Sequence, residues 1–417
     1  EFRRVLFRSL AVGALAVVAL VSLAMQQARP DDGKVRAIPS PNAYANELIS
    51  RVSTESLARF HDLIATEPHV AGTAGDERQI ARIAKAFQDM GLPVHVQWFR
   101  CLLCRPKKAL LEIVDGGPVT PTGGARGVVP LQVNERNLAE DPATAHPDLT
   151  YGWNAYSGNG DVTAPVVYAN YGLREDYDTL KARGIDVKGK IVLVRYGRCF
   201  RGFKARFAEE RGAAGVLLYT DPGDAGFTKG KVWPEGGGWA NDSCLQRGTL
   251  NTLPYPGDPG TPGVFSGDNV MRDAPATLDL PRIPVQPIGY GAAQEIFARM
   301  KGAAAPAEWR GGLASDYPLA DDALRLRLEV EQRREVARTA NVIARLRGAA
   351  LPDEQVLVGS HHDAWCFGAA DPLAGTICTL ESARNFCELA RAGVRADRTL
   401  RSEEHTSELQ SPYVISY

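Results

Sequence analysis

The sequence lacks an excess of charge of either sign. Its 48 lysines and arginines nearly balance its 49 aspartates and glutamates, so the formal net charge at pH 7 is −1. A chain this neutral does not indicate nucleic acid or an acidic membrane surface as a partner. It also lacks internal repeats and long low-complexity tracts. What remains is an ordinary globular composition over 417 residues, which is enough for two or more domains.

Cysteine is sparse and forms no recognisable metal framework. The chain has seven cysteines, an odd number. Cys101 and Cys104 in "CLLC" have the spacing of metal ligands, but no second pair lies near them in the sequence. We interpret this pair as structural, or as a candidate disulfide in an exported chain, and the sequence leaves cysteine pairing open.

The longest apolar run, Leu10–Met25, is short for a membrane-spanning helix and is followed at once by the polar stretch "QQARPDDGK". This pattern favours the hydrophobic region of a signal peptide, or a membrane anchor, over a buried core helix. We therefore expect an exported protein that is periplasmic, extracellular or membrane-anchored, with its main domain outside the cytoplasm.

The two ends of the chain are complementary at the level of DNA. The start "EFRRVLFRS" back-translates into a segment whose opposite strand reads "RSEEHTSEL", which is the sequence of residues 401–409. We interpret residues 1–9 and 401–417 as adapter-derived scars, and exclude them from fold prediction. On this interpretation Glu403 and Glu404 only imitate a catalytic acidic pair.

Hydrophobic periodicity predicts an α/β protein. Residues 73–91 have helical spacing, and residues 93–99 alternate like a strand. Residues 101–333 are rich in turn residues and predict short strands, among them a β-α-β unit. Further segments predict strands at 340–348 and 354–363, a helix at 372–393, and the β-α-β unit at 190–197, 203–215 and 216–222.

The stretch "VLVGSHHDAWCFGAADPLAG", residues 356–375, reads like one edge of a metal site. His361 lies at the end of a predicted central strand, where sites form in open α/β sheets. Residues i and i+2 of an extended chain point the same way, so His361 and Asp363 share a side and His362 faces away. Asp363 then suits the role of a carboxylate that orients a ligating histidine. The following loop is long enough to bring Asp371 back beside His361.

Two structural interpretations of these residues stay open. Asp371 and Pro372 form a good helix start, with the aspartate as N-cap and the proline in the first turn. His361 is also compatible with a hydrogen-bonded core histidine. Zinc sites use roughly three or four protein ligands, and this stretch supplies two.

At these residues the chain resembles the glutamate carboxypeptidase II and transferrin receptor group of the co-catalytic zinc aminopeptidase-like superfamily. "GSHHDAWCFGAADPLAG" looks like the group's first metal segment, and "EPHVAGT" looks like its early protease segment. Residues 189–222, "LQRGTLN" and "GDPGTPG" resemble its protease-associated (PA) domain. "IPVQPIGYGAAQEIFARM" and "WRGGL" are similar to the return towards the protease domain. These motifs occur in the family's order over residues 40–400.

The resemblance implies an α/β fold in which a zinc-aminopeptidase-like mixed sheet, incomplete here, is flanked by helices and interrupted by an inserted PA domain of β-rich α/β type. The expected segments are a signal peptide or anchor with linker at 10–39, a partial zinc-peptidase domain at 40–100 and 335–400, and the PA domain at 101–334.

The resemblance also implies roles for single residues. His361 matches a ligand of one of two zinc ions, Asp371 matches the carboxylate that bridges them, and Asp363 matches the aspartate that orients the ligating histidine. In such pairs the metals activate a water and polarise the scissile carbonyl, and a glutamate serves as general base. Thr261 matches a position that contributes to a structural calcium site. The implied cofactors are thus two Zn²⁺ and one Ca²⁺.

The sequence departs from the family pattern at two places. An acidic D-x-E-E-x-G segment with the general base and a further zinc ligand is expected soon after "DRTL", but the chain runs into the predicted scar after Leu400. The arginine that binds the substrate carboxylate falls on Leu173, with Arg174 one place along, and an asparagine falls on Thr249. Arg174 is therefore the candidate substrate-binding residue, and a preference for glutamate is not indicated.

Three functions are compatible with these features. The first is a fragment of an exported dizinc exopeptidase that hydrolyses small peptides, inactive as given, whose full-length form is a homodimer through a missing C-terminal helical domain. The second is a non-catalytic, transferrin-receptor-like binding module, and the third is a general aminopeptidase or dipeptidase. Retention of His361 and Asp371 favours the enzyme over the receptor branch, which lacks the zinc ligands.

Overall fold

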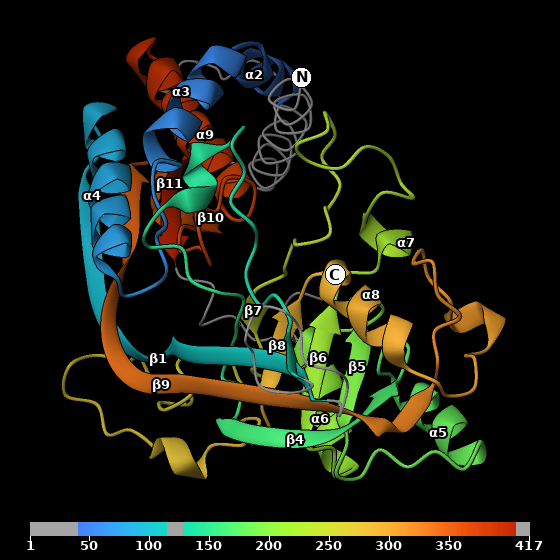
Figure 1. The fold of residues 1–417 in the computed structure, drawn as a ribbon. Coiled ribbons are helices and arrows are strands. Elements are labelled where there is room, and N and C mark those ends of the chain that lie inside the picture. The colour runs from blue at the N-terminus through green and yellow to red at the C-terminus, as the bar shows by residue number, and fades with distance from the viewer. Residues whose placement is uncertain (1–40, 115–127, 406–417) are drawn as a thin grey trace. The chain divides into compact units, whose positions relative to one another are not determined.

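Residues 41–114 and 128–405 are described by a computed structural model, which divides the chain into two units (Figure 1). The described part of the first unit comprises residues 41–101, 264–271 and 337–405. The second unit comprises residues 102–114, 128–263 and 272–336. The long strands β1 (Val94–Val114) and β9 (Ala320–Leu346) each run through residues of both units.

The first unit is a small mixed sheet with helices. Strand β11 is parallel to β10, pairing Leu400 with Val356, and antiparallel to β9, pairing Leu400 with Leu346. A mixed sheet with helices is the α/β class that the sequence predicted. The bounds of its elements, besides β1 and β9, are α2 (Pro41–Ser50), α3 (Thr54–Ile64), α4 (Ala74–Asp89), β10 (Leu351–His361), α9 (Leu373–Arg391) and β11 (Arg398–His405).

Helix α4 illustrates how the sequence builds this unit. Thr73 caps the helix, because its side chain accepts a hydrogen bond from the backbone N–H of Asp76. Ile80, Ile83 and Phe87 recur at helical spacing and are buried in one apolar cluster, which also contains residues of α3, α9 and β9. The helix predicted at 73–91 is therefore confirmed, as is the one predicted at 372–393.

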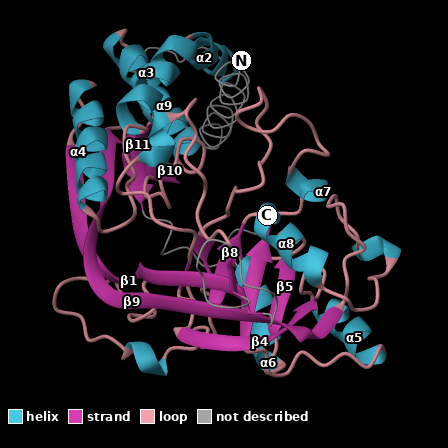
Figure 2. Cartoon of the chain, viewed as in Figure 1, coloured by secondary structure: helices cyan, strands magenta, loops and turns pink. Residues whose placement is uncertain are grey.

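The second unit is built on four parallel strands in the order β4-β5-β6-β8, with β9 antiparallel to β4 (Figure 2). The predicted β-α-β unit is confirmed as β5, α6 and β6. The bounds of the larger elements are β4 (Gly160–Tyr168), α5 (Arg174–Ala182), β5 (Ile191–Arg195), α6 (Arg201–Glu210), β6 (Gly215–Tyr219), β8 (Val285–Ile288) and α8 (Tyr290–Arg299). The short ones are β2 (Val128–Pro130), β3 (Asn154–Ala155), α7 (Pro222–Ala225), β7 (Gly248–Thr249) and three 3₁₀ turns at 142–145, 275–277 and 307–309.

Strands β1 and β9 differ from the prediction of short strands throughout residues 101–333. β9 is 27 residues long and β1 is 21. The sequence "ALRLRLEV" in β9 alternates apolar and charged residues, and Leu324, Leu326, Leu328 and Val330 are buried while the charged residues between them are less so. This period of two is the signature of an extended strand, and the abundance of turn residues elsewhere in the region concealed it.

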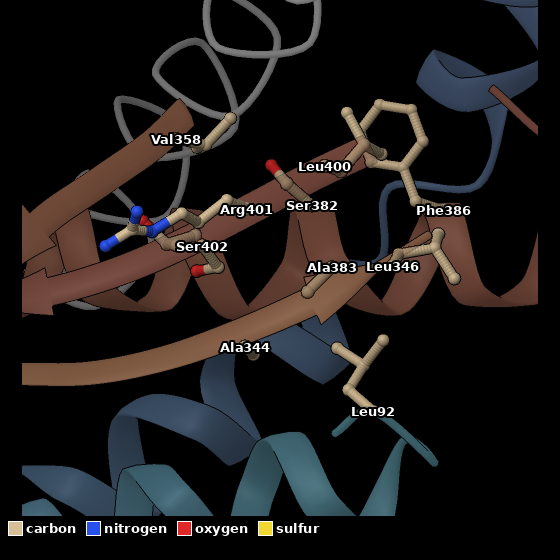
Figure 3. A pocket seen from close by; sticks show the side chains of 11 residues that line it. Leu92, Ala344, Leu346, Val358, Ser382, Ala383, Phe386, Leu400, Arg401 and Ser402 are labelled. Carbon is tan, nitrogen blue, oxygen red and sulfur yellow. The ribbon is translucent and has the colours of Figure 1, made fainter. Parts of the chain in front are cut away.

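Residues 401–405, which were excluded from fold prediction as part of the proposed scar, extend strand β11. Their backbone continues the pairing with β9 and β10. The side chains of Arg401 and Ser402 line a cavity of about 30 Å³ whose other walls are mostly apolar (Figure 3). The hydroxyl of Ser402 is buried there and has no hydrogen-bond partner among the described residues. A buried polar group without a partner is destabilising.

Candidate metal centre

His361 is the last residue of β10, a strand whose apolar alternation places Val356 and Val358 against the apolar cluster of α2 and α9. Its imidazole lies between two carboxylates. Nδ1 is 3.1 Å from Oδ1 of Asp363 and also 3.1 Å from the carbonyl oxygen of Asp363. Nε2 is 3.1 Å from Oδ1 of Asp371. The predicted proximity of these three side chains is therefore observed.

The two carboxylates differ in their surroundings. The side chain of Asp363 is 5% exposed and that of Asp371 is 90% exposed, with His361 between them at 23%. A carboxylate on one ring nitrogen fixes the orientation of an imidazole and leaves the other nitrogen directed outward. Asp363 is thus placed to orient His361, and Nε2 and Asp371 form the outward face.

The carboxylates also set the protonation of His361. Burial lowers the pKa of His361, but the hydrogen bonds to Asp363 and Asp371 outweigh burial and raise the pKa to about 10. In the protein without metal the ring is therefore a cation held by two anions. A histidine must be neutral to bind a metal, so metal binding here would displace a proton.

Asp371 is not the N-cap residue of the following helix, contrary to the helix-start interpretation. Helix α9 begins at Leu373, and its N-cap residue is Pro372, whose side chain makes no capping hydrogen bond. The loop turns back at Gly368, whose φ of 62° is in the left-handed region that glycine favours. The backbone N–H of Leu373 donates to the carbonyl of Gly368. This turn directs Asp371 towards His361.

His362 faces away from this pair, as its neighbouring position in an extended chain predicts. It is fully buried. Its Nε2 lies 3.0 Å from the carbonyl oxygen of Ala340, and its Nδ1 lies 3.4 Å from Oδ1 of Asp76. It is therefore not a candidate ligand.

Sequence analysis missed two buried polar residues, His69 and Asp76, near the segment 361–371. Both side chains are fully buried, and both interact electrostatically with His362 and Asp363. The signal was present in "EPHVAGTAGD", where the Thr-x-x-Asp pattern marks the helix start. Nothing in the pattern shows, however, that the Asp76 side chain turns inward.

His361 and Asp371 suit two ligand positions of a zinc site. Among the described residues, no group of three or more His, Cys, Asp or Glu side chains is placed to hold a metal ion. Zinc sites use about three or four protein ligands. The described residues therefore fit part of such a centre, and no reaction step is derived through a metal here.

The candidate substrate residue, Arg174, is the first residue of α5 in the second unit. Its guanidinium pairs with Glu210 at 3.1 Å and lies over the Phe207 ring, 4.1 Å from the centroid. Thr249, at the position of the family's asparagine, accepts a hydrogen bond from the backbone N–H of Asn251. Arg174 thus already has an anionic partner within its own unit.

The candidate calcium residue, Thr261, is buried, and its hydroxyl donates to Asp258 at 2.8 Å. The same carboxylate pairs with Arg272 and accepts from the backbone N–H of Leu102. Calcium takes about six to eight oxygen ligands. This arginine-paired carboxylate does not supply such a set, so the residues present do not by themselves fit a calcium ion.

The candidate disulfide between Cys101 and Cys104 is not formed in the structure. Both lie on β1 at an odd separation, which directs their side chains to opposite faces of the strand. The Sγ of Cys104 instead accepts a hydrogen bond from the backbone N–H of Tyr156. The predicted apolar segment Leu10–Met25 lies outside the described residues, and within them no helix has the length and hydropathy needed to span a membrane.

The chain is similar to a known domain family, to curated proteins and to solved structures. A family model described as the PA domain matches residues 162–243. The "Glutamate carboxypeptidase 2 homolog" of Caenorhabditis briggsae is 32% identical over 357 residues, which covers 82% of this chain and 45% of the relative. The rat "Aminopeptidase NAALADL1" is 33% identical over 348 residues, with 79% of this chain and 45% of the relative covered.

A rat "Transferrin receptor protein 2" is 35% identical over 269 residues, covering 64% of this chain and 32% of the relative. Among solved structures, a "Peptidase M28 precursor" from Shewanella amazonensis SB2B aligns with a TM-score of 0.50 at 16% identity, over 96% of this chain and 69% of that one. The chain thus spans about half the length, or less, of the curated relatives named here. It belongs to the glutamate carboxypeptidase II and transferrin receptor group, with its zinc aminopeptidase-like α/β fold and PA domain.

Proposed function

We propose that this chain is part of an exported dizinc exopeptidase that hydrolyses small peptides. The observation that supports the proposal best is the placement of His361, which Asp363 orients while Nε2 faces the exposed carboxylate of Asp371. Such an arrangement suits a histidine ligand beside a bridging carboxylate. Two zinc ions in a complete site would supply an activated water and a polarised carbonyl.

On this proposal, residues 40–100 and 335–400 belong to the peptidase domain and residues 101–334 to the PA domain. The proposed domains largely coincide with the two units, except that residues 264–271 of the proposed PA domain belong to the first unit. The PA family match falls inside the proposed PA domain. Export is proposed from the apolar run Leu10–Met25. Peptides are the proposed substrates, since relatives are named carboxypeptidases and an aminopeptidase. A homodimer of the full-length protein is part of the same proposal.

The chain as given is proposed to lack turnover. The described residues supply two candidate zinc ligands, and among them no group of three or more His, Cys, Asp or Glu side chains is placed to hold a metal ion, whereas a zinc site uses about three or four. Turnover of dipeptides and N-acylated peptides, and zinc retained after dialysis, are measured for the wild type and for His361→Ala. We expect no turnover and no stoichiometric zinc in either protein. Turnover that His361→Ala abolishes would contradict the proposed inactivity.

A receptor-like module is the second candidate, favoured by the similarity to a transferrin receptor. The full-length natural protein distinguishes the two functions. The enzyme proposal predicts peptide hydrolysis that requires zinc and that His361→Ala and Asp371→Ala abolish. A folded full-length protein without hydrolysis of amino- or carboxy-terminal residues would favour the receptor. Comparing free and blocked amino termini in the same assay separates aminopeptidase from carboxypeptidase action.

A further inference from the structure

The side chain of His362 is held between a backbone carbonyl and a carboxylate on the side of the chain opposite His361. Its Nε2 is 3.0 Å from the carbonyl oxygen of Ala340 near the end of β9. Its Nδ1 is 3.4 Å from Oδ1 of Asp76 in the first turn of α4. A carbonyl oxygen can only accept, so Nε2 carries a proton and donates it to Ala340.

Asp76 connects this histidine to two further segments. Its Oδ2 accepts hydrogen bonds from the backbone N–H of Gly72 at 2.7 Å and from the hydroxyl of Thr339 at 2.8 Å. The carboxylate and the imidazole are both fully buried. Oδ2 of Asp76 therefore joins the start of α4 to β9 by hydrogen bonds. Its Oδ1 lies at ion-pair distance from Nδ1 of His362, and neither Oδ1 nor Nδ1 has a hydrogen-bond partner among the described residues.

The backbone of the metal segment is attached to the same region. The N–H of Ala364 donates to the carbonyl of His69, and the N–H of His69 donates to the carbonyl of Cys366, each at 3.1 Å. The segment from His69 to Asp76 thus runs along the loop after β10 and contacts it by both backbone and side chain.

We propose that Asp76 and His362 are positioning residues that form a buried brace. The brace fixes the backbone at residues 361–363, where the strand ends, and so holds the His361 ring between Asp363 and Asp371. Without such support the end of the strand could move and change the orientation of the ring, and metal and binding sites depend on supporting contacts of this kind. The metal-binding role of His361 rests on the proposed function, but its orientation is measured without metal.

The test uses the full chain labelled with ¹⁵N-histidine, whose seven histidines keep the spectrum simple. The ring signals of His361 are assigned by their loss in His361→Ala. Asp76→Leu and His362→Leu are each expected to lower the melting temperature by several degrees and to shift or broaden the His361 ring signals. Removing one partner of a buried pair is more damaging than removing both. The double variant is therefore expected to be less destabilised than the sum of the two single variants.

Two further variants keep the test decisive. Asp76→Asn keeps the shape of the side chain and can still accept from the backbone N–H of Gly72 and the hydroxyl of Thr339, so it is expected to keep wild-type His361 signals. Gln79→Leu is the matched control, because Gln79 is equally buried on the same helix and its side-chain amide has no hydrogen-bond partner among the described residues. It is expected to leave the His361 signals unchanged.

Three results would overturn the brace. The first is a loss of stability in the double variant that equals the sum of the losses in the single variants. The second is wild-type His361 signals in Asp76→Leu and His362→Leu although both variants are destabilised. The third is a change of the His361 signals in Gln79→Leu as large as in those two variants. If the leucine variants fail to fold, wild-type signals in Asp76→Asn support the proposal, and altered signals there contradict it. None of these readouts depends on zinc, so failure of the proposed function would be seen separately, as absence of zinc-dependent hydrolysis in the full-length protein.

Discussion

The dipeptide Asp-Pro occurs four times in this chain, and two of its aspartates, in the loops after β6 and β10, have opposite roles. In the second unit, Asp221 is the N-cap of α7, and its side chain accepts from the backbone N–H of Gly223. In the first unit, Asp371 precedes α9 without capping it and instead faces His361. The same two residues thus serve the fold in one loop and form an exposed candidate ligand in the other.

The surroundings of the two carboxylates explain the difference. Asp221 is fully buried and accepts from the N–H groups of Gly223 and Gly312, both at 2.7 Å, and from the hydroxyls of Tyr219 and Tyr317, at 3.1 and 2.6 Å. Its hydrogen-bonding capacity is used by the protein itself. The side chain of Asp371 is 90% exposed, so solvent or a ligand can reach it. A structural carboxylate is enclosed by donors, whereas a ligand carboxylate remains accessible.

The largest effect is expected for Asp221→Ala. The substitution leaves two tyrosine hydroxyls and two backbone N–H groups without their acceptor, and the free energy of unfolding should fall by about 3–5 kcal/mol. Urea unfolding followed by fluorescence measures the loss. Asp221→Asn, which keeps the shape and one oxygen, should lose less. A change below about 1 kcal/mol in the alanine variant would remove the contrast with Asp371.

A smaller loss is expected for Tyr317→Phe. The hydroxyl of Tyr317 donates to Asp221 at 2.6 Å and accepts from the backbone N–H of Leu313 at 2.8 Å, so its removal leaves both groups with one partner fewer. The free energy of unfolding should fall by about 1.5–3 kcal/mol. Tyr219→Phe is the comparison, because its hydroxyl lies farther from Asp221, at 3.1 Å. If the free energy of unfolding falls equally in the two variants, the hydrogen-bond distances to Asp221 do not predict how much each hydroxyl contributes to stability.

The smallest effect is expected for Asp371→Ala. Asp371 is exposed, so solvent screens its pairing with the partly buried His361, and the free energy of unfolding should fall by less than about 1 kcal/mol. The same urea unfolding experiment measures it. A loss that approaches the loss in Asp221→Ala would show that Asp371 does support the start of α9, as the helix-start interpretation holds.

Local pattern predicted the parts of the molecule that depend on neighbours in sequence. The helix at Ile80–Phe87 and the pairing of His361 with Asp363 follow from periodicities of helix and strand. The sequence also predicted that the loop after β10 can bring Asp371 back beside His361, but it left open whether Asp371 is a metal ligand or a helix cap. The dipeptide alone could not decide between them, because the decision depends on the turn at Gly368 and on what lies across the loop.

Contacts between distant segments could not be predicted in this way. The inward turn of Asp76 towards His362 joins residues far apart in the chain, and the pairing of Arg174 with Glu210 joins two helices. The great length of β9 was also missed, because its regular alternation of leucines and charges lies in a region dominated by glycine and proline. The resemblance to a family supplied the architecture, and the side-chain partners came from the structure.

The central claim is that His361 and Asp371 form one wall of a zinc site. The most direct test adds Zn²⁺ in large excess to the ¹⁵N-histidine-labelled chain and follows the His361 ring signals in the wild type, Asp371→Ala and Asp221→Asn. We expect zinc to shift the His361 signals in the wild type and in Asp221→Asn, and to shift them far less in Asp371→Ala. Signals of His361 that zinc leaves unchanged, or that shift equally in Asp371→Ala, would contradict the claim.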